Sequence, residues 1–163
     1  MTTIRLIGVP TDINSSFLRG PAKAPAVIRR ALASDHSSGT PQIGQGFGED
    51  FRLEDAGDLT LVEGPADFDT VRAAVSRGLE DGAVPFCLGG DHSITLPLLR
   101  AYKAWLGRPL AVIHFDAHCD TWTDHFGEPS GHGTWVYEAM TEGLVLEQGF
   151  VQIGIRSAGE REA

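Results

Sequence analysis

Residues 84–120 read VPFCLGGDHSITLPLLRAYKAWLGRPLAVIHFDAHCD, and this stretch indicates the fold class. Val84 to Leu88 is a short continuous apolar run, Leu96 to Leu106 has a helical pattern, and Leu110 to Phe115 is a second apolar run. Short unbroken apolar runs are typical of strands that are buried on both faces. Strands of this kind that alternate with helices predict a parallel sheet with helices on both faces, a three-layer α/β/α fold.

The same alternation extends to both sides of this stretch. The pattern predicts further strands at 4–9 and 150–155 and further helices at 25–32, at 67–80 with Asp67 as its cap, and at 134–141. Residues 34–50 are polar and glycine-rich and are expected to form a surface loop. At 163 residues the chain can bury one core, so we expect residues 1–163 to belong to a single α/β domain.

Composition excludes several classes of protein. The chain has 13 Lys plus Arg against 22 Asp plus Glu, a formal charge of −9 that disfavours nucleic acid and favours cationic ligands. No basic leader and no apolar run long enough to span a membrane is evident, so we expect no membrane partner and a cytoplasmic location. Cys87 and Cys119 lack the spacing of a zinc or redox motif and are expected to be reduced thiols.

Two polar clusters directly follow two of the predicted strands. Gly89-Gly90-Asp91-His92-Ser93 follows the first strand of the quoted stretch, and Asp116-Ala117-His118-Cys119-Asp120 follows the second. Open parallel sheets bind ligands at the carboxyl ends of their strands. In extended backbone Asp116, His118 and Asp120 would point to one side. Two carboxylates with imidazoles suit manganese, magnesium or zinc, so the clusters predict a metal site.

Each cluster also has a purely structural interpretation. Gly89-Gly90 can be a tight turn, and Asp91 or Ser93 can cap the following helix. The alternating cluster is harder to explain in this way, because closely spaced carboxylates repel one another unless a cation neutralises them. The spacing therefore favours metal binding over the structural interpretation.

The remaining histidines and the second cysteine have less context. His132 lies in a glycine-flanked loop before a predicted helix and is either an ordinary loop histidine or a titratable group near a ligand. His114 lies within an apolar strand and is expected to be buried with a satisfied hydrogen bond, and Cys119 is expected to pack away from the ligands. His36 and His125 belong to no recognisable cluster.

These motifs, in this order and spacing, resemble the ureohydrolase family, which includes arginase, agmatinase, guanidinobutyrase and formimidoylglutamase. The resemblance covers nearly the whole chain and is closest to agmatinase-like members. It is carried by Gly-Val-Pro at 8–10, Asp-Ala-Gly-Asp-Leu at 55–59, Gly-Gly-Asp-His-Ser at 89–93, Asp-Ala-His-Cys-Asp at 116–120, His-Gly-Thr at 132–134 and Gln-Ile-Gly-Ile-Arg at 152–156.

The resemblance implies a site and an activity. His92 and Asp120 would bind one Mn²⁺ ion, His118 would bind a second, Asp116 would bridge them, and His132 would act as a proton shuttle. The implied reaction is hydrolysis of a guanidino carbon–nitrogen bond with release of urea from agmatine or a guanidino acid, in polyamine or arginine metabolism. A homo-oligomeric full-length enzyme is also implied.

The chain departs from the family pattern at its end. The pattern continues with a Ser-x-Asp-x-Asp-x-x-Asp-Pro segment that supplies two more aspartate ligands, and this segment does not occur before Ala163. We therefore expect residues 1–163 to be the N-terminal part of a ureohydrolase domain with its C-terminal portion missing, and to be inactive alone. The alternatives are a metal-binding remnant without activity and an arginase-fold zinc deacetylase, which the first cluster and Asp120 disfavour.

Overall fold

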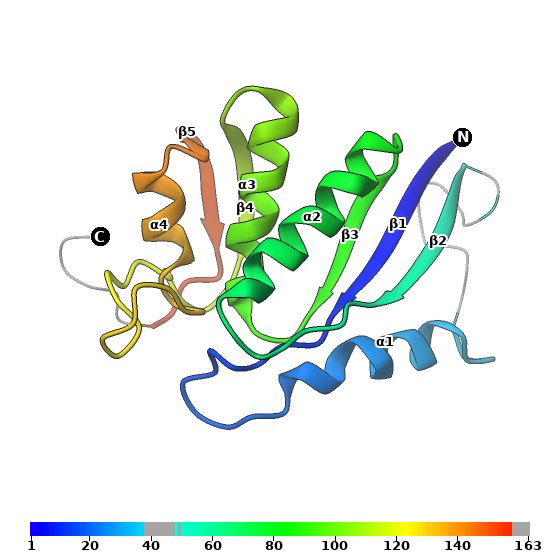
Figure 1. The fold of residues 1–163 in the computed structure, drawn as a ribbon, viewed down its shortest axis with the longest axis horizontal. Helices are drawn as coiled ribbons and strands as arrows, with labels where there is room; N and C mark the ends of the chain where they lie inside the picture. Colours follow the sequence, from blue (N-terminus) through cyan, green and yellow to red (C-terminus); the bar gives the residue numbers. More distant parts are fainter. Residues whose placement is uncertain (38–47, 49, 158–163) are drawn as a thin grey trace. The chain divides into compact units, whose positions relative to one another are not determined.

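The computed structural model describes residues 1–37, 48 and 50–157, and the chain forms two compact units (Figure 1). The first unit contains residues 1–13 and 19–90, and the second contains residues 14–18 together with the chain from 91 onward. The strands are β1 Thr2–Val9, β2 Phe51–Asp58, β3 Val84–Gly89, β4 Leu110–Phe115 and β5 Val145–Ile153. The α-helices are α1 Ala24–Leu32, α2 Ala66–Glu80, α3 Thr95–Leu106 and α4 Trp135–Thr141.

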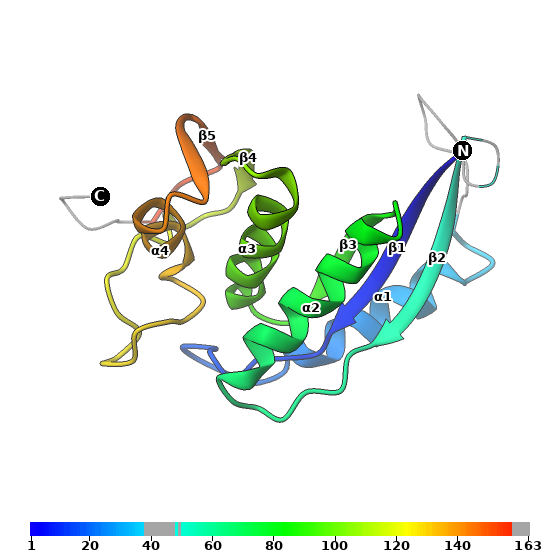
Figure 2. The ribbon, with the colours of Figure 1, turned by 45° about the horizontal axis from the view of Figure 1, so that its top comes forward.

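The first unit is a parallel sheet with the strand order β2-β1-β3. β2 pairs with one edge of β1 and β3 pairs with the other edge. Right-handed connections between these parallel strands therefore place α1 and α2 on opposite faces of the sheet. Figure 2 shows α2 in front of this sheet and α1 behind it. Val71, Val75 and Leu79, four residues apart on α2, are buried together with Leu6 and Val9 of β1.

The second unit is built around the parallel pair β4 and β5, with helices α3 and α4 in contact. Leu96 and Leu99 of α3 are buried, as are Trp135 and Ala139 of α4. The predicted α/β class with parallel sheets is therefore confirmed, and four of the five strands arise from the apolar runs identified in the sequence. The expectation that residues 1–163 belong to a single domain stays a prediction.

The structure differs from the sequence-based elements at several points. Strand β2 was missed, and the last strand begins at Val145 instead of at residue 150. Asp67 is not the cap of α2, which is preceded by Pro65; its carboxylate instead accepts hydrogen bonds from the backbone of Val62 and Gly64. Most of the loop expected at 34–50 lies outside the described residues.

Strand β2 escaped detection because its sequence, FRLEDAGD, is too polar for a buried strand. It lies at the edge of the sheet, where one side has no partner strand among the described residues. Ion pairs with neighbouring elements accommodate its charges: Arg5 Nε lies 2.9 Å from a Glu54 carboxylate oxygen, and Arg29 Nε lies 2.9 Å from Asp55. Charged side chains are common on edge strands, where they also oppose unwanted pairing.

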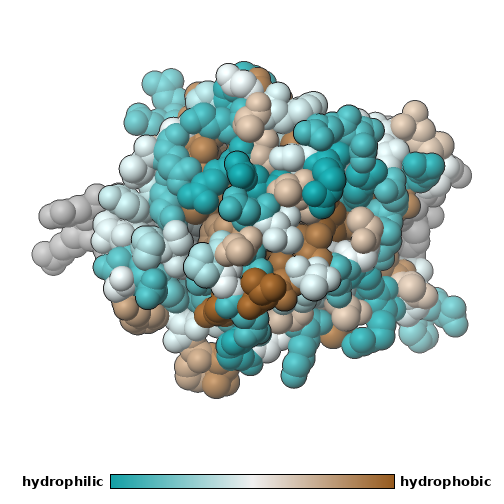
Figure 3. All heavy atoms as spheres, in the orientation of Figure 1, coloured by the Kyte–Doolittle hydropathy of each residue, from teal (hydrophilic) through white to brown (hydrophobic). Residues whose placement is uncertain are grey.

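Among the described residues, none of the helices has both the length and the apolar character needed to cross a membrane. The surface nevertheless exposes apolar side chains among hydrophilic ones, as Figure 3 shows for one face of the molecule. On β4 and β5, Ile113 is paired with Val151 and Phe115 with Ile153, and each of these side chains is at least 45% exposed. These four residues form what we call the β4–β5 apolar patch.

The β4–β5 apolar patch predicts self-association of the 163-residue chain, because a contiguous apolar surface of this kind favours contact with other molecules. Replacing Ile113 and Phe115 with Ser should shift the sedimentation profile toward the monomer. The matched control replaces Val62 and Trp105 with Ser, since these two are exposed but lie outside the patch. Equal association of both double variants and the unmodified chain would contradict this prediction.

Candidate metal centre

A capped turn after β3 positions His92. Asp91 is the cap of the short 3₁₀ helix His92–Ile94, and its carboxylate accepts hydrogen bonds from the backbone N–H and the hydroxyl of Ser93 at 2.9 and 2.5 Å. The backbone N–H of Asn14 donates to the second carboxylate oxygen at 3.0 Å. Asp91 thus has the structural role of a helix cap, and its bonds fix the backbone that carries the His92 ring.

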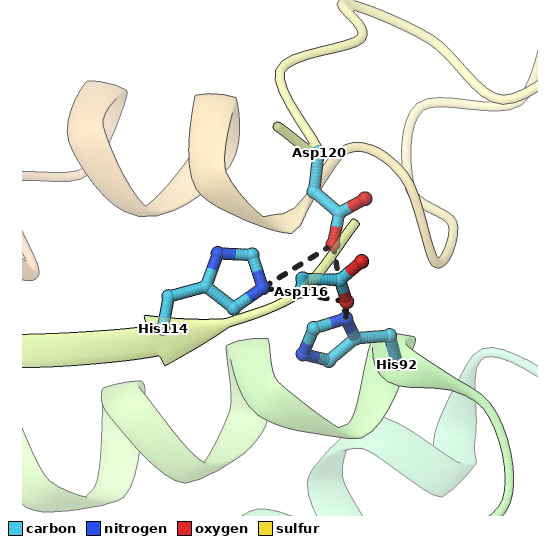
Figure 4. A group of neighbouring side chains, drawn as sticks. All are labelled: His92, His114, Asp116 and Asp120. Carbon is cyan, nitrogen blue, oxygen red and sulfur yellow. Dashed lines mark ion pairs between the residues drawn. The ribbon is translucent and has the colours of Figure 1, made fainter. Parts of the chain in front are cut away.

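His92, Asp116 and Asp120 converge at the carboxyl end of β4 (Figure 4). His92 Nδ1 lies 3.1 Å from Asp116 Oδ2 and 2.9 Å from Asp120 Oδ2. The Asp120 side chain is 8% exposed and that of Asp116 is 21% exposed. Asp120 has a positive φ of 54°, a left-handed conformation that is uncommon for residues other than glycine.

His118 reaches Asp116 from a different side. Its backbone N–H donates to Asp116 Oδ1 at 2.8 Å, and its ring Nδ1 lies 3.0 Å from the same oxygen. The ring is 67% exposed, because the backbone bends after Phe115 and does not stay extended as the alternation assumed. The two oxygens of Asp116 therefore face two imidazoles, Oδ2 toward His92 and Oδ1 toward His118.

The bend also changes the surroundings of Cys119. We expected Cys119 to pack away from the ligands, but it lines the same cavity as they do. The cavity has a volume of about 280 Å³, close to the small end of ligand pockets. Its lining residues are Ser16, His92, Asp116, His118, Cys119, Asp120, Thr121, Trp122, His132, Gly133 and Ser157, which all belong to the second unit.

His114 is part of the cluster, although the sequence interpretation treated it as a core residue. It is 5% exposed, and its Nδ1 lies 3.0 Å from Gln152 Nε2, so the expected burial and hydrogen bond are both present. Its Nε2 has no hydrogen-bond partner and lies 3.5 Å from Asp116 Oδ2 and 3.8 Å from Asp120 Oδ2. The two-residue alternation that selected positions 116, 118 and 120 also includes 114 and could have found it.

Trp135 is a second residue that the sequence analysis missed. Its ring is almost fully buried at the start of α4, and its Nε1–H donates a hydrogen bond to Asp120 Oδ2 at 2.8 Å. Removing a residue that orients a carboxylate of a metal site commonly lowers the metal affinity by about 10 to 100-fold. Trp135 is therefore a candidate for orienting Asp120.

Replacing Trp135 with Phe tests this orientation, because Phe retains an aromatic ring but cannot donate to Asp120. We expect the affinity of the chain for Mn²⁺, measured by calorimetric titration, to fall by about 10 to 100-fold. The matched control is Trp105→Phe, at an exposed position on α3 that does not line the cavity. Equal affinities in the two variants would show that the hydrogen bond to Asp120 does not matter for the metal.

His132 borders the same cavity from the loop before α4. Its Nε2 is buried and has no hydrogen-bond partner. Burial lowers the pKa of His132, and the charge of a protonated His125, whose ring centroid is 5.4 Å away, lowers it further. The His125 ring can lie this close to His132 because residue 131 is glycine. A Cβ at position 131 would lie 2.2 Å from the His125 ring. His132 is therefore a neutral imidazole at neutral pH.

The charges of the cluster suit a divalent cation. Burial alone would raise the pKa of Asp116, but the backbone N–H of His118 and the neighbouring His92 together hold that pKa below its ordinary value. Burial and the nearby His92 lower the pKa of His114, so that this ring is neutral. In the described part of the chain, His92, His114, Asp116 and Asp120 each offer a ligand atom, and these atoms lie within 4.8 Å of one another. Carboxylate oxygens and imidazole nitrogens are donors that Mn²⁺ and Zn²⁺ accept.

The chain is similar to known proteins over nearly its whole length. The chain is 36% identical to an agmatinase of Chromobacterium violaceum over 94% of its own length and 48% of the relative. The crystal structure of a hypothetical agmatinase from Burkholderia thailandensis matches 98% of the chain and 51% of that protein, with a TM-score of 0.87 and 33% identity. An arginase from Medicago truncatula also has a TM-score of 0.87, with 30% identity over 98% of this chain and 52% of that one.

The chain spans about half the length of the curated relatives that it matches. A profile of the arginase family matches residues 2–163, which include every residue of the cluster described above. The fold of the solved relatives, the order of the motifs and the family profile lead to one conclusion. The chain belongs to the arginase family.

Proposed function

We propose that this chain supplies the first half of the active site of a metal-dependent hydrolase that releases urea from a small guanidino compound. The observation that carries the proposal is the convergence of His92, Asp116 and Asp120 in one cavity with His132. The activity would belong to a protein about twice this length, as in the relatives, with further carboxylate ligands from its second half. Agmatine is the first candidate substrate, because several relatives are agmatinases.

The proposed metal ligands are His92, Asp116, His118 and Asp120, and the proposed ions are two Mn²⁺. His92 and Asp120 would hold one ion, His118 would hold the other, and Asp116 would contact both. The placement of the two Asp116 oxygens toward two different imidazoles supports this bridging role. When bound, such an ion pair would lower the pKa of a water molecule and stabilise negative charge that develops during hydrolysis.

The residues of the chain would contribute binding and proton transfer. The negatively charged cavity wall, formed by Asp116 and Asp120, favours a cationic guanidinium group. His132 is neutral at neutral pH and lines the cavity, so it can accept a proton and pass it to the departing amine. Because the leaving group is an amine, which is a poor leaving group unless it is protonated, this transfer would lower the barrier of the reaction.

The experiment is an assay of urea release by the complete protein that contains this chain, loaded with Mn²⁺ and tested with agmatine, guanidinobutyrate and arginine. We expect one of these compounds to be hydrolysed and the rate to fall to background after the metal is removed with a chelator. Residues 1–163 alone, assayed in parallel, are expected to bind metal without releasing urea. Metal binding without hydrolysis of any of the three compounds by the complete protein would instead favour a non-catalytic metal-binding role.

A further inference from the structure

Gln152 and His114 are a hydrogen-bonded pair behind the carboxylates of the cluster. The two residues are opposite one another in the register of β4 and β5, and their side chains share the face of this sheet that is opposite to the β4–β5 apolar patch. Gln152 Nε2 lies 2.8 Å from the backbone oxygen of Cys119 and 3.0 Å from His114 Nδ1. A single amide nitrogen thus contacts both the loop that carries the ligands and the buried imidazole.

These contacts determine which nitrogen of the His114 ring carries the proton. The Cys119 carbonyl can only accept a hydrogen bond, so the Gln152 group beside it must be the NH₂ and cannot be the amide oxygen. The second hydrogen of this NH₂ points to His114 Nδ1, which must then accept. A ring whose Nδ1 accepts a hydrogen bond carries its N–H on Nε2.

Two carboxylates lie near the Nε2–H of His114. This atom is buried, it has no partner within hydrogen-bonding distance, and it lies 3.5 Å from Asp116 Oδ2 and 3.8 Å from Asp120 Oδ2. The same two oxygens face His92 Nδ1 (Figure 4). A small movement of either carboxylate would complete a hydrogen bond that removes the cost of the buried unpaired donor.

We infer that Gln152 and His114 are positioning residues of the metal centre, an inference that rests on the proposed metal-binding function. Gln152 fixes His114 as the Nε2–H form, and His114 then directs the Oδ2 atoms of Asp116 and Asp120 toward the position that His92 faces. A ring that carries its proton on Nε2 cannot be a metal ligand through that atom. His114 is therefore an orienting donor, and the ligand set stays His92, Asp116, His118 and Asp120.

The test uses the ¹⁵N-labelled 163-residue chain and the variant Gln152→Glu, which has almost the same shape. A carboxylate cannot donate to His114 Nδ1, and it favours a ring that carries a proton on Nδ1. The matched control is Gln148→Glu, which makes the same chemical change at an exposed position of the same strand. Long-range ¹H–¹⁵N spectra report the protonation pattern of the ring, and the EPR signal of free Mn²⁺ reports metal affinity.

We expect the His114 ring of the unmodified chain to carry its proton on Nε2 alone. In Gln152→Glu the Nδ1 should become protonated and the Mn²⁺ affinity should fall by about 10 to 100-fold, while Gln148→Glu changes neither. Gln152→Met removes the donor without adding charge and should also weaken Mn²⁺ binding. It replaces Gln152→Glu as the test variant if the Glu variant does not fold.

A proton on Nδ1 in the unmodified chain, or an unchanged Mn²⁺ affinity in both folded Gln152 variants, would overturn the inference. The ring measurement is made without metal and without substrate, so it separates this inference from the proposed hydrolysis. An Nε2–H ring in a chain that binds no Mn²⁺ would leave the hydrogen-bond assignment standing but overturn the positioning role together with the proposed metal site.

Discussion

Replacing Asp116 with Asn should abolish tight Mn²⁺ binding and lower urea release by the complete protein by ~10³-fold or more, equivalent to about 4 kcal/mol of transition-state free energy. The two oxygens of Asp116 face His92 and His118 separately, so this carboxylate is placed to contact both ions. An amide has almost the same shape but lacks the negative charge, and its NH₂ group cannot bind a cation. Metal content by mass spectrometry and initial rates would be measured on the same samples.

The matched control for this variant is Asp124→Asn. Asp124 lies in the loop after the cluster, is exposed, and accepts a hydrogen bond from the backbone of Gly127 that Asn can also accept. We expect it to keep both Mn²⁺ and activity. If Asp116→Asn bound Mn²⁺ as tightly as Asp124→Asn, the bridging role of Asp116 would be wrong.

Replacing His132 with Ala should lower the turnover number of the complete protein by about 10² to 10⁴-fold, the range typical for the loss of a general acid or base. The metal content should not change, because His132 is proposed to transfer a proton and not to bind the ions. The control His36→Ala removes an exposed histidine of the first unit and should have no effect. Loss of Mn²⁺ from His132→Ala would contradict the proposed division of roles.

The pH dependence of turnover gives a second test of His132. Because burial and His125 lower its pKa, the imidazole is neutral at neutral pH and becomes charged only as the pH falls through this lowered value. Turnover should therefore decline at acidic pH, and His132→Ala should lose the part of this decline that reflects the imidazole. A profile that is unchanged in shape in the variant would assign the acidic limb to another group.

How much of the fold the sequence predicts depends on how apolar each strand is. β1, β3 and β4 are apolar runs and were found as strands. Leu6 to Val9 of β1 are buried, whereas Phe86 of β3 and Ile113 and Phe115 of β4 are exposed. β2 could not be predicted in this way, because its charges are accommodated by Arg5 and Arg29, which are distant in sequence. The stabilising partners of an edge strand are visible only once the chain has folded.

The candidate site was likewise predicted only in part from the sequence. Motif spacing brought His92, Asp116 and Asp120 forward as metal ligands, and these three converge in the structure. The two-residue alternation did not anticipate the backbone bend at 117–118, the exposure of His118 or the left-handed conformation of Asp120. Trp135 was beyond sequence reasoning, because a buried tryptophan at the start of a helix gives no sign that its N–H meets a carboxylate 15 residues earlier.

The most direct test of the central claim is anomalous diffraction at the manganese absorption edge from crystals of the complete protein grown with Mn²⁺. We predict one peak beside His92, Asp116 and Asp120 and a second peak beside Asp116 and His118. The ring of His114 should lie behind the first peak without binding it. A well-ordered site with no anomalous peak at either position, or with manganese bound elsewhere in the protein, would contradict the account.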